Sequence, residues 1–375
     1  MTMIYLDNGA TTPPDPEILD GMAAIEVEHF GNTSSSHRLG LEAQQALDDA
    51  RARVAQAFGG RARNVIFTGG GTEAITLAIL GSAGPRPGRI AISAVEHSAV
   101  KEAAKWLHEN RAWSVDVVPV NAFGQVDTET LRAHVSKDTR IVATMMVNNE
   151  IGAINPIKAI GQAVKQRAPR AKLIVDAVQA FGKVPFNVAD LGADCVAVAA
   201  HKLHGPKGCG ALWSRHALTP MAKGGGQEFG QRGGTPSLSN AWALGEAYER
   251  QWAAREQILS LRDHLWALLL DALPDIELTG PPFDSGRVCN NIHMCIPGLP
   301  TEPVLNALSA EGVFVSGGSA CSAGRFSSVL EALGRRPQEG AFIRLTVGRF
   351  NVPAELPNAV DKIRKVVADL RRVYG

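Results

Sequence analysis

Two stretches decide the fold: Lys172-Leu-Ile-Val-Asp-Ala-Val-Gln179 and Asp194-Cys-Val-Ala-Val-Ala-Ala-His-Lys202. Each holds an uninterrupted apolar run that ends in polar residues. A strand that is apolar on both faces is buried on both faces, as in a parallel sheet covered by helices. Similar strand patterns occur at 65–70, 89–93, 115–120 and 140–149, and helical patterns at 72–81, 98–110 and 156–168. This alternation predicts an α/β layer around a mainly parallel sheet.

The pattern changes after about residue 258. A long helix is predicted at 260–273, strands at 287–298 and 342–348, and a final helix from 353 to the end. We therefore expect a large domain over 16–258 and a smaller α+β domain over 259–375. We expect residues 1–15 to form an N-terminal segment that packs with the smaller domain.

Charge and cysteine content exclude several classes of protein. The 375 residues carry 38 Lys and Arg against 37 Asp and Glu, a formal charge of +1. Such a balance argues against a mainly electrostatic binder of nucleic acid or of an anionic membrane. No run of about 18 apolar residues is present to span a bilayer. The five cysteines are odd in number and form no Cys-x-x-Cys pair, which favours a reducing, cytoplasmic setting over a disulfide framework.

Polar residues follow the predicted strands. In open α/β sheets, ligands bind beyond the carboxyl ends of the strands, and parallel strands bring these ends to one edge. The polar groups expected at that edge are Gly69-Gly-Gly-Thr-Glu73, Glu96-His97, Asn148-Asn-Glu150, Asp176-Ala-Val-Gln179 and His201-Lys202. The sequence therefore predicts a binding site at this edge, whatever its ligand.

The glycine run at 69–71 allows three interpretations. Gly69, Gly71 and Ala74 fit G-x-G-x-x-A, a weak dinucleotide signal. A glycine loop before a helix also suits any phosphate, because free N–H groups and the helix dipole hold an anion. A tight turn without a ligand is the third possibility.

Lys202 and Asp176 are more informative together than apart. A lysine at the end of an apolar strand either extends to solvent or has a task such as Schiff-base formation. A lysine, an acid and a phosphate cradle at one edge form the set that pyridoxal 5'-phosphate (PLP) requires. A zinc site made of His201, His204 and Cys209 is the weaker alternative, because this spacing resembles no closed structural site, and we expect no metal.

Cys321 and Arg344 lie in contrasting contexts. Cys321 is surrounded by glycine and serine over 316–324, which predicts an exposed, reactive thiol or an incidental one. Arg344 lies inside an apolar strand pattern and needs an anionic partner there. Either a substrate carboxylate or an internal salt bridge would serve.

Taken together, these motifs resemble those of the cysteine desulfurases of the NifS/IscS type, PLP enzymes with the aspartate-aminotransferase fold. The resemblance runs from end to end. Its motifs are YLDNGATTP at 5–13, FGNTSSSH at 30–37, FTGGGTEA at 67–74, EH at 96–97, NNEIG at 148–152, DAVQAFGK at 176–183, HKLHGPKG at 201–208, GGGQEFGQRGGT at 224–235, GSAC at 318–321 and IRLTVGRF at 343–350. So many ordered motifs make coincidence a poor explanation.

The resemblance implies fold type I of the PLP-dependent transferases, with a mainly parallel seven-stranded sheet in the large domain and the catalytic cysteine loop in the small one. It also implies roles for the residues at the predicted edge. Lys202 would bind PLP covalently, His97 would stack on its ring, Asp176 would pair with the ring nitrogen, and Gln179 would bond the phenolate oxygen. The phosphate would be held by Gly71, Thr72 and His201, together with Thr235 of a neighbouring subunit. Asn149 and Arg344 would bind the substrate carboxylate, and Cys321 would accept sulfur.

Two departures from the family pattern affect the phosphate. The family has a serine two residues before the histidine of the His-Lys pair, where this chain has Ala199, and a segment usually reading SGAT is Gly69-Gly-Gly-Thr72 here. The residues implied to do chemistry, by contrast, are all present.

The function implied is removal of sulfur from L-cysteine, giving L-alanine and a persulfide on Cys321. The sulfur would pass to an acceptor or scaffold protein for iron–sulfur cluster assembly or tRNA thiolation. The enzyme would be a homodimer with shared sites. Three rivals remain: another PLP enzyme such as a selenocysteine lyase or aminotransferase, a catalytically weak scaffold for sulfur-transfer proteins, and a nicotinamide oxidoreductase.

Overall fold

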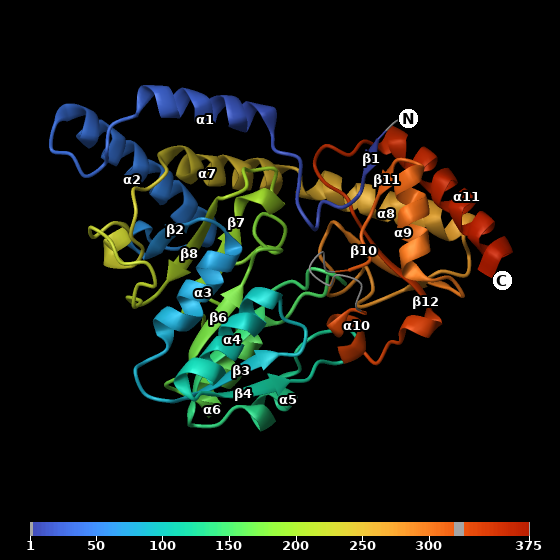
Figure 1. Cartoon of the computed structure of the whole chain (residues 1–375), viewed down its shortest axis with the longest axis horizontal. Helices are drawn as coiled ribbons and strands as arrows, with labels where there is room; N and C mark the ends of the chain where they lie inside the picture. The colour runs from blue at the N-terminus through green and yellow to red at the C-terminus, as the bar shows by residue number, and fades with distance from the viewer. Residues whose placement is uncertain (1–2, 319–325, 375) are drawn as a thin grey trace.

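A seven-stranded sheet forms the centre of the larger lobe in the computed structural model, which describes residues 3–318 and 326–374 (Figure 1). The strands lie in the order β2 (Val65–Thr68), β8 (Gly210–Ser214), β7 (Cys195–Ala199), β6 (Lys172–Asp176), β5 (Thr139–Met145), β3 (Arg89–Ser93) and β4 (Ser114–Val118). Only β8 runs against its two neighbours. The predicted mainly parallel sheet is therefore confirmed, and the six like-directed strands end at one edge.

Helices cover both faces of this sheet, because successive strand residues point to opposite sides. Ile174 and Ala197 face the buried cluster that contains α3 and α4, whereas Val175 and Val198 face the one that contains α2, α6 and α7. The helices of this lobe are α1 (Pro16–Glu28), α2 (Arg38–Phe58), α3 (Gly71–Ser82), α4 (Ser98–Arg111), α5 (Thr128–His134), α6 (Ile157–Arg167) and α7 (Leu238–Ala253).

The C-terminal lobe is built on a three-stranded antiparallel sheet in the order β12 (Gly340–Thr346), β10 (Asn291–Pro297) and β9 (Glu277–Leu278). Its helices are α8 (Arg255–Ala272), α9 (Thr301–Ala310), α10 (Ser328–Ala332) and α11 (Leu356–Tyr374). Short 3-10 turns occupy Ala62–Asn64, Ala200–Lys202, Glu228–Gly230, Pro337–Glu339 and Pro353–Glu355. Within the ranges described, no helix combines the length and apolar character needed to cross a bilayer.

The N-terminal segment joins the C-terminal lobe. Strand β1 (Ile4–Tyr5) pairs in parallel with β11 (Val313–Phe314), and Asp7 forms a bridge with Thr346. In Figure 1 this blue segment enters the lobe that is otherwise orange and red. The domain division at 258 and 259 stays a prediction, and it falls inside α8.

Several predicted boundaries were wrong at strand ends. The strand predicted at 194–202 ends at Ala199, and Lys202 lies in the 3-10 turn that follows. The strands predicted at 172–179 and 140–149 end at Asp176 and Met145. In each case the apolar character continues past the last ladder hydrogen bond, because the loop that follows is itself buried. Burial sets the sequence pattern, so the pattern overstates strand length.

Candidate active site

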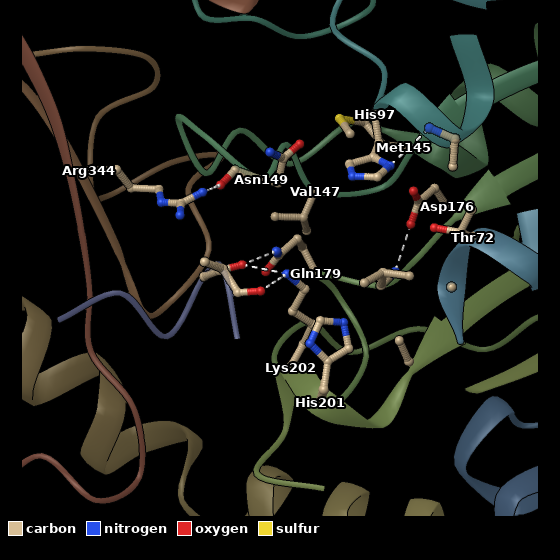
Figure 2. A pocket seen from close by; sticks show the side chains of 16 residues that line it. Thr72, His97, Met145, Val147, Asn149, Asp176, Gln179, His201, Lys202 and Arg344 are labelled. Carbon is tan, nitrogen blue, oxygen red and sulfur yellow. Dashed lines mark hydrogen bonds between the residues drawn. The ribbon is translucent and has the colours of Figure 1, made fainter. Parts of the chain in front are cut away.

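A cavity of about 310 Å³ opens beyond the carboxyl ends of the parallel strands. Its lining includes most of the residues predicted from sequence: Gly71, Thr72, His97, Asn149, Asp176, Gln179, His201, Lys202 and Arg344. Figure 2 shows Arg344 and Asn149 on one side, Asp176 and Thr72 on the other, and Lys202 between them. Cys321 lies outside the described residues.

Lys202 projects from the turn after β7 and is held by the N-terminal segment. Its Nζ donates to the carbonyl oxygens of Gly9 at 2.8 Å and Ala10 at 2.6 Å. Burial, followed by the positive charges of Arg344 and Lys183, lowers the pKa of Lys202 to about 7. Much of the amine is therefore neutral near pH 7, as a nucleophile must be.

Asp176 is the last residue of β6 and is buried. One of its oxygens, Oδ1, accepts from the Val178 N–H at 2.9 Å. Burial raises the pKa of this carboxyl. Among the described residues no lysine, arginine or histidine forms a salt bridge with it, so the carboxylate has capacity for a cationic partner that occupies the cavity.

His97 caps the start of α4. Its Nδ1 accepts from the Ala99 N–H at 3.1 Å, which places the ring proton of the neutral form on Nε2. Burial lowers its pKa. The ring is thus a neutral aromatic face at the cavity wall.

The start of α3 forms the anion-binding end. Gly70 caps the helix with a φ of +143°, and no side chain within the described ranges bonds its first N–H groups. A Cβ on Gly71 would lie 2.7 Å from Val178 Cγ2, so only glycine permits this approach to the loop after β6. Thr72 and Ala199 line the same end of the cavity. Ala199 offers a methyl group there, and no hydroxyl.

His201 stands beside Lys202 and is neutral. Its Nδ1 lies 3.2 Å from Thr11 Oγ1. Burial and the neighbouring charge of Lys202 lower the pKa of His201 to about 4. It therefore offers a hydrogen bond and no charge to an anion.

Arg344 reaches the opposite end from the middle of β12. Nη1 donates to the Asn149 carbonyl at 2.7 Å, and Nη2 pairs with Asp7 Oδ1 at 2.7 Å. The guanidinium is only 2% exposed, and its Nε has no partner in the part of the chain described. The internal salt bridge left open above is therefore present, while the guanidinium still faces the cavity.

Thr235 lies apart from this cavity. It is exposed and lines a second hollow of about 140 Å³. Its segment is anchored at Glu228, which accepts from both Arg51 Nη atoms and from the Phe67 N–H. Within one chain, Thr235 does not reach the residues around Lys202.

The N-terminal segment lies over the site, although the sequence predicted only that it packs with the smaller domain. Asp7, Gly9, Ala10 and Thr11 bond to Arg344, Gln179, Lys202 and His201. The motif YLDNGATTP was the available signal, but nothing in its local pattern indicates which distant residues it meets. The zinc alternative is not assembled among the residues described: Cys209 donates to the Asn240 carbonyl, while His204 faces the Pro13 carbonyl.

Comparison with known proteins identifies the family. The class-V aminotransferase model matches residues 4–358. The chain belongs to the class-V aminotransferase family. It is 36% identical to the cysteine desulfurase IscS of Methanosarcina thermophila, over 99% of this chain and 93% of the relative.

Two solved structures extend the family comparison. A NifS-like protein superposes with a TM-score of 0.90 at 31% identity, covering 98% of this chain and 100% of that one. SspA, solved in complex with cysteine, superposes with a TM-score of 0.82 at 27% identity, covering 94% of this chain and 100% of that one. The expected PLP-dependent fold type I is thereby confirmed.

PLP is the cofactor of this class-V family, and the cavity fits it. The uncapped helix start suits a phosphate. A buried carboxylate with no cation suits a protonated ring nitrogen, and a lysine of lowered pKa suits covalent attachment. Two of the expected phosphate contacts are missing from this cavity: Ala199 has no hydroxyl, and Thr235 lies outside it.

Proposed function

We propose that this protein is a PLP-dependent L-cysteine desulfurase. The observation that carries the proposal is the cavity in which a lysine of lowered pKa, an unpaired buried carboxylate and an arginine meet. Lys202, Asp176 and Arg344 come from different parts of the chain, and the fold brings all three to this one cavity. The full-length similarity to cysteine desulfurases supports the same assignment.

Each part of the cofactor would be held by different residues of the cavity. Lys202 would hold PLP covalently, and Asp176 would keep the ring nitrogen protonated. Gln179 would donate to the phenolate oxygen, and His97 would stack on the ring. The N–H groups of Gly71 and Thr72, the Thr72 hydroxyl and His201 would hold the phosphate. When bound, PLP withdraws electrons from the substrate Cα and so makes its proton acidic.

Substrate binding uses the opposite end of the cavity. The Arg344 guanidinium and the Asn149 side chain bind the carboxylate of cysteine, which places the amino group toward Lys202. The fork of an arginine binds a carboxylate through two parallel hydrogen bonds and so fixes its orientation as well as its charge. SspA, whose solved structure contains cysteine, shows that a related fold accommodates this amino acid.

Proton transfer is assigned to Lys202. Its pKa of about 7 lets the amine take the Cα proton and return a proton to the product at neutral pH. The two N-terminal carbonyls that accept from Nζ keep it directed into the cavity.

Sulfur transfer is assigned to Cys321, from the resemblance of its GSAC motif. The Cys321 thiolate attacks the substrate sulfur, and the new S–S bond forms as the substrate C–S bond breaks. The electron pair of the C–S bond stays on the substrate carbon, which takes up protons and leaves as alanine. Cys321 ends as a persulfide that carries both sulfur atoms, for delivery to an acceptor or scaffold protein in cluster assembly or tRNA thiolation.

The working enzyme is proposed to be a homodimer. Thr235 is exposed and outside its own cavity, so it is available to the phosphate site of a second copy. The glycine-rich segment 224–235 suits close approach to a neighbour. A cytoplasmic location stays our prediction from the cysteine pattern; the four cysteines described are buried free thiols.

The test is the visible absorption spectrum of the purified protein before and after addition of cysteine, with alanine and sulfide measured under a thiol reductant. A yellow protein whose band changes and which releases both products in equal amounts is expected. A colourless protein would support the scaffold alternative. Turnover of selenocysteine or of an amino acid with a keto acid, without cysteine turnover, would support the other PLP alternatives.

A further inference from the structure

Lys183 is a buried lysine without an acidic partner. It is 4% exposed and lies in the turn that follows β6. Of the described carboxylates, none forms a salt bridge with it. A buried ammonium group without a carboxylate is costly to fold, and burial lowers the pKa of Lys183 to about 8. Because Lys183 is unfavourable for stability, we look for a role of this residue in function.

The turn places Lys183 directly against Gln179. The N–H groups of Phe181 and Val184 donate to the carbonyls of Ala177 and Ala180, so the segment has helical spacing. Residues four apart then share one side. The Lys183 Nζ lies 3.4 Å from both the backbone oxygen and the Oε1 of Gln179.

These contacts allow only one orientation of the Gln179 amide. Its Oε1 faces the ammonium group, and its Nε2 donates to the Gly9 carbonyl at 2.9 Å. A flipped amide would direct its NH2 at a cation and its oxygen at a carbonyl oxygen. Both contacts would then be repulsive, so Lys183 and the Gly9 carbonyl together set the orientation of the amide, and the second N–H of Nε2 is left for the cavity.

We propose that Lys183 is a positioning residue that holds the Gln179 amide with its N–H toward the cavity, where it donates to the phenolate oxygen of bound PLP. The inference rests on the role given to Gln179 above and goes beyond it, because Lys183 does not line the cavity.

The charge of Lys183 is a competing explanation for any effect of its removal. Its positive charge contributes to lowering the pKa of Lys202, His201 and His204, and the Cys289 thiol is the ionisable group that acts on Lys183 in turn. The experiment must therefore separate orientation from charge.

A double-mutant cycle read out by the absorption of bound PLP makes this separation. The measurement is the apparent pKa of the visible band of the PLP-loaded protein. Gln179→Ala should raise this pKa by about one unit, since one donor to the phenolate is lost. Lys183→Met should raise it similarly. Most of the Lys183→Met shift should disappear when Gln179 is already alanine.

Each outcome is decisive. An undiminished Lys183→Met shift in the Gln179→Ala background overturns the inference and shows that Lys183 acts through charge alone. An unchanged pKa in Gln179→Ala alone overturns the role proposed for Gln179, and the inference with it. Lys183→Gln provides the second variant: it removes the charge but keeps an N–H donor. It should retain a near-native pKa, and a shift as large as that of Lys183→Met overturns the proposal.

Discussion

Replacement of Arg344 by alanine distinguishes a substrate-binding arginine from a structural one. The guanidinium donates to the Asn149 carbonyl and pairs with Asp7, at 2.7 Å in each case. Asn149 lies with Arg344 at the end of the cavity farther from Asp176 (Figure 2). If the substrate carboxylate binds there, the variant loses charge-assisted hydrogen bonds to it.

The size of the expected increase in the Michaelis constant follows from the type of hydrogen bond that is lost. A hydrogen bond to a charged group contributes about 1.5–3 kcal/mol, which corresponds to about 10- to 100-fold in the Michaelis constant for cysteine. PLP retention should change little, because the residues proposed to hold the cofactor lie elsewhere in the cavity. Asp7→Asn is the matched control: its amide oxygen still accepts from Arg344, so KM should stay within about threefold.

The assay measures the rate of alanine release against cysteine concentration. Bound PLP is quantified by absorbance, and Tm is taken from thermal unfolding of each variant. An unchanged KM in Arg344→Ala, together with a fall in Tm matched by Asp7→Asn, would refute the reasoning. Arg344 would then be half of a structural ion pair.

Four further outcomes are expected. Lys202→Ala should remove the covalent attachment of PLP; a visible band that survives dialysis and borohydride would assign attachment to another lysine, such as Lys207. Cys321→Ser should keep that band and still bind cysteine yet form no persulfide, because a hydroxyl is a poor nucleophile toward sulfur; sulfide release at the wild-type rate would show the thiol to be incidental. Thr235→Ala should weaken PLP binding by about 0.5–1.5 kcal/mol and Ala199→Ser should recover part of it; light scattering during a PLP titration tests the shared site, and a monomer with full PLP occupancy would contradict it. In cofactor-free protein, PLP capture should slow about tenfold per pH unit below about pH 7, because only the neutral Lys202 amine attacks and its pKa is lowered to about 7. A rate of capture that does not change between pH 6 and 9 would show that this amine is not the one that reacts.

The core of the larger lobe was predictable because its strands are buried on both faces. The segment 89–93 was predicted with its exact bounds, since charged or glycine residues flank it on one side and the turn of Ala94 and Val95 follows on the other. The reversed strand β8 was not predicted. Its sequence, GALWS, is as long as β7, but it begins at a glycine and ends at a serine, so only three consecutive apolar residues mark it as a strand.

The site was predictable where chemistry is local to a strand end. Asp176, His97 and Lys202 are polar residues that interrupt apolar context, and such residues are costly unless they are used. The carbonyls of Gly9 and Ala10 were not predictable, because backbone groups carry no sequence signature, and the Asp7 carboxylate was not predictable because its partner, Arg344, is far along the chain. Their partners depend on contacts with segments far along the chain.

The position of the N-terminal segment has a consequence for how the protein is made. Asn8 donates to the carbonyl of Thr346, 338 residues later, and Gly9 and Ala10 complete the surroundings of Lys202. During synthesis, residues 4–12 leave the ribosome long before their partner strand β12, which lies more than 300 residues later in the chain. The larger sheet has all of its strands once Ser214 is made, so it can begin to fold while the amine of Lys202 still lacks its carbonyl contacts. Capture of PLP in its final geometry therefore waits until β12 has been made, and chains that stop before β12 should expose an unfinished site to chaperones and proteases.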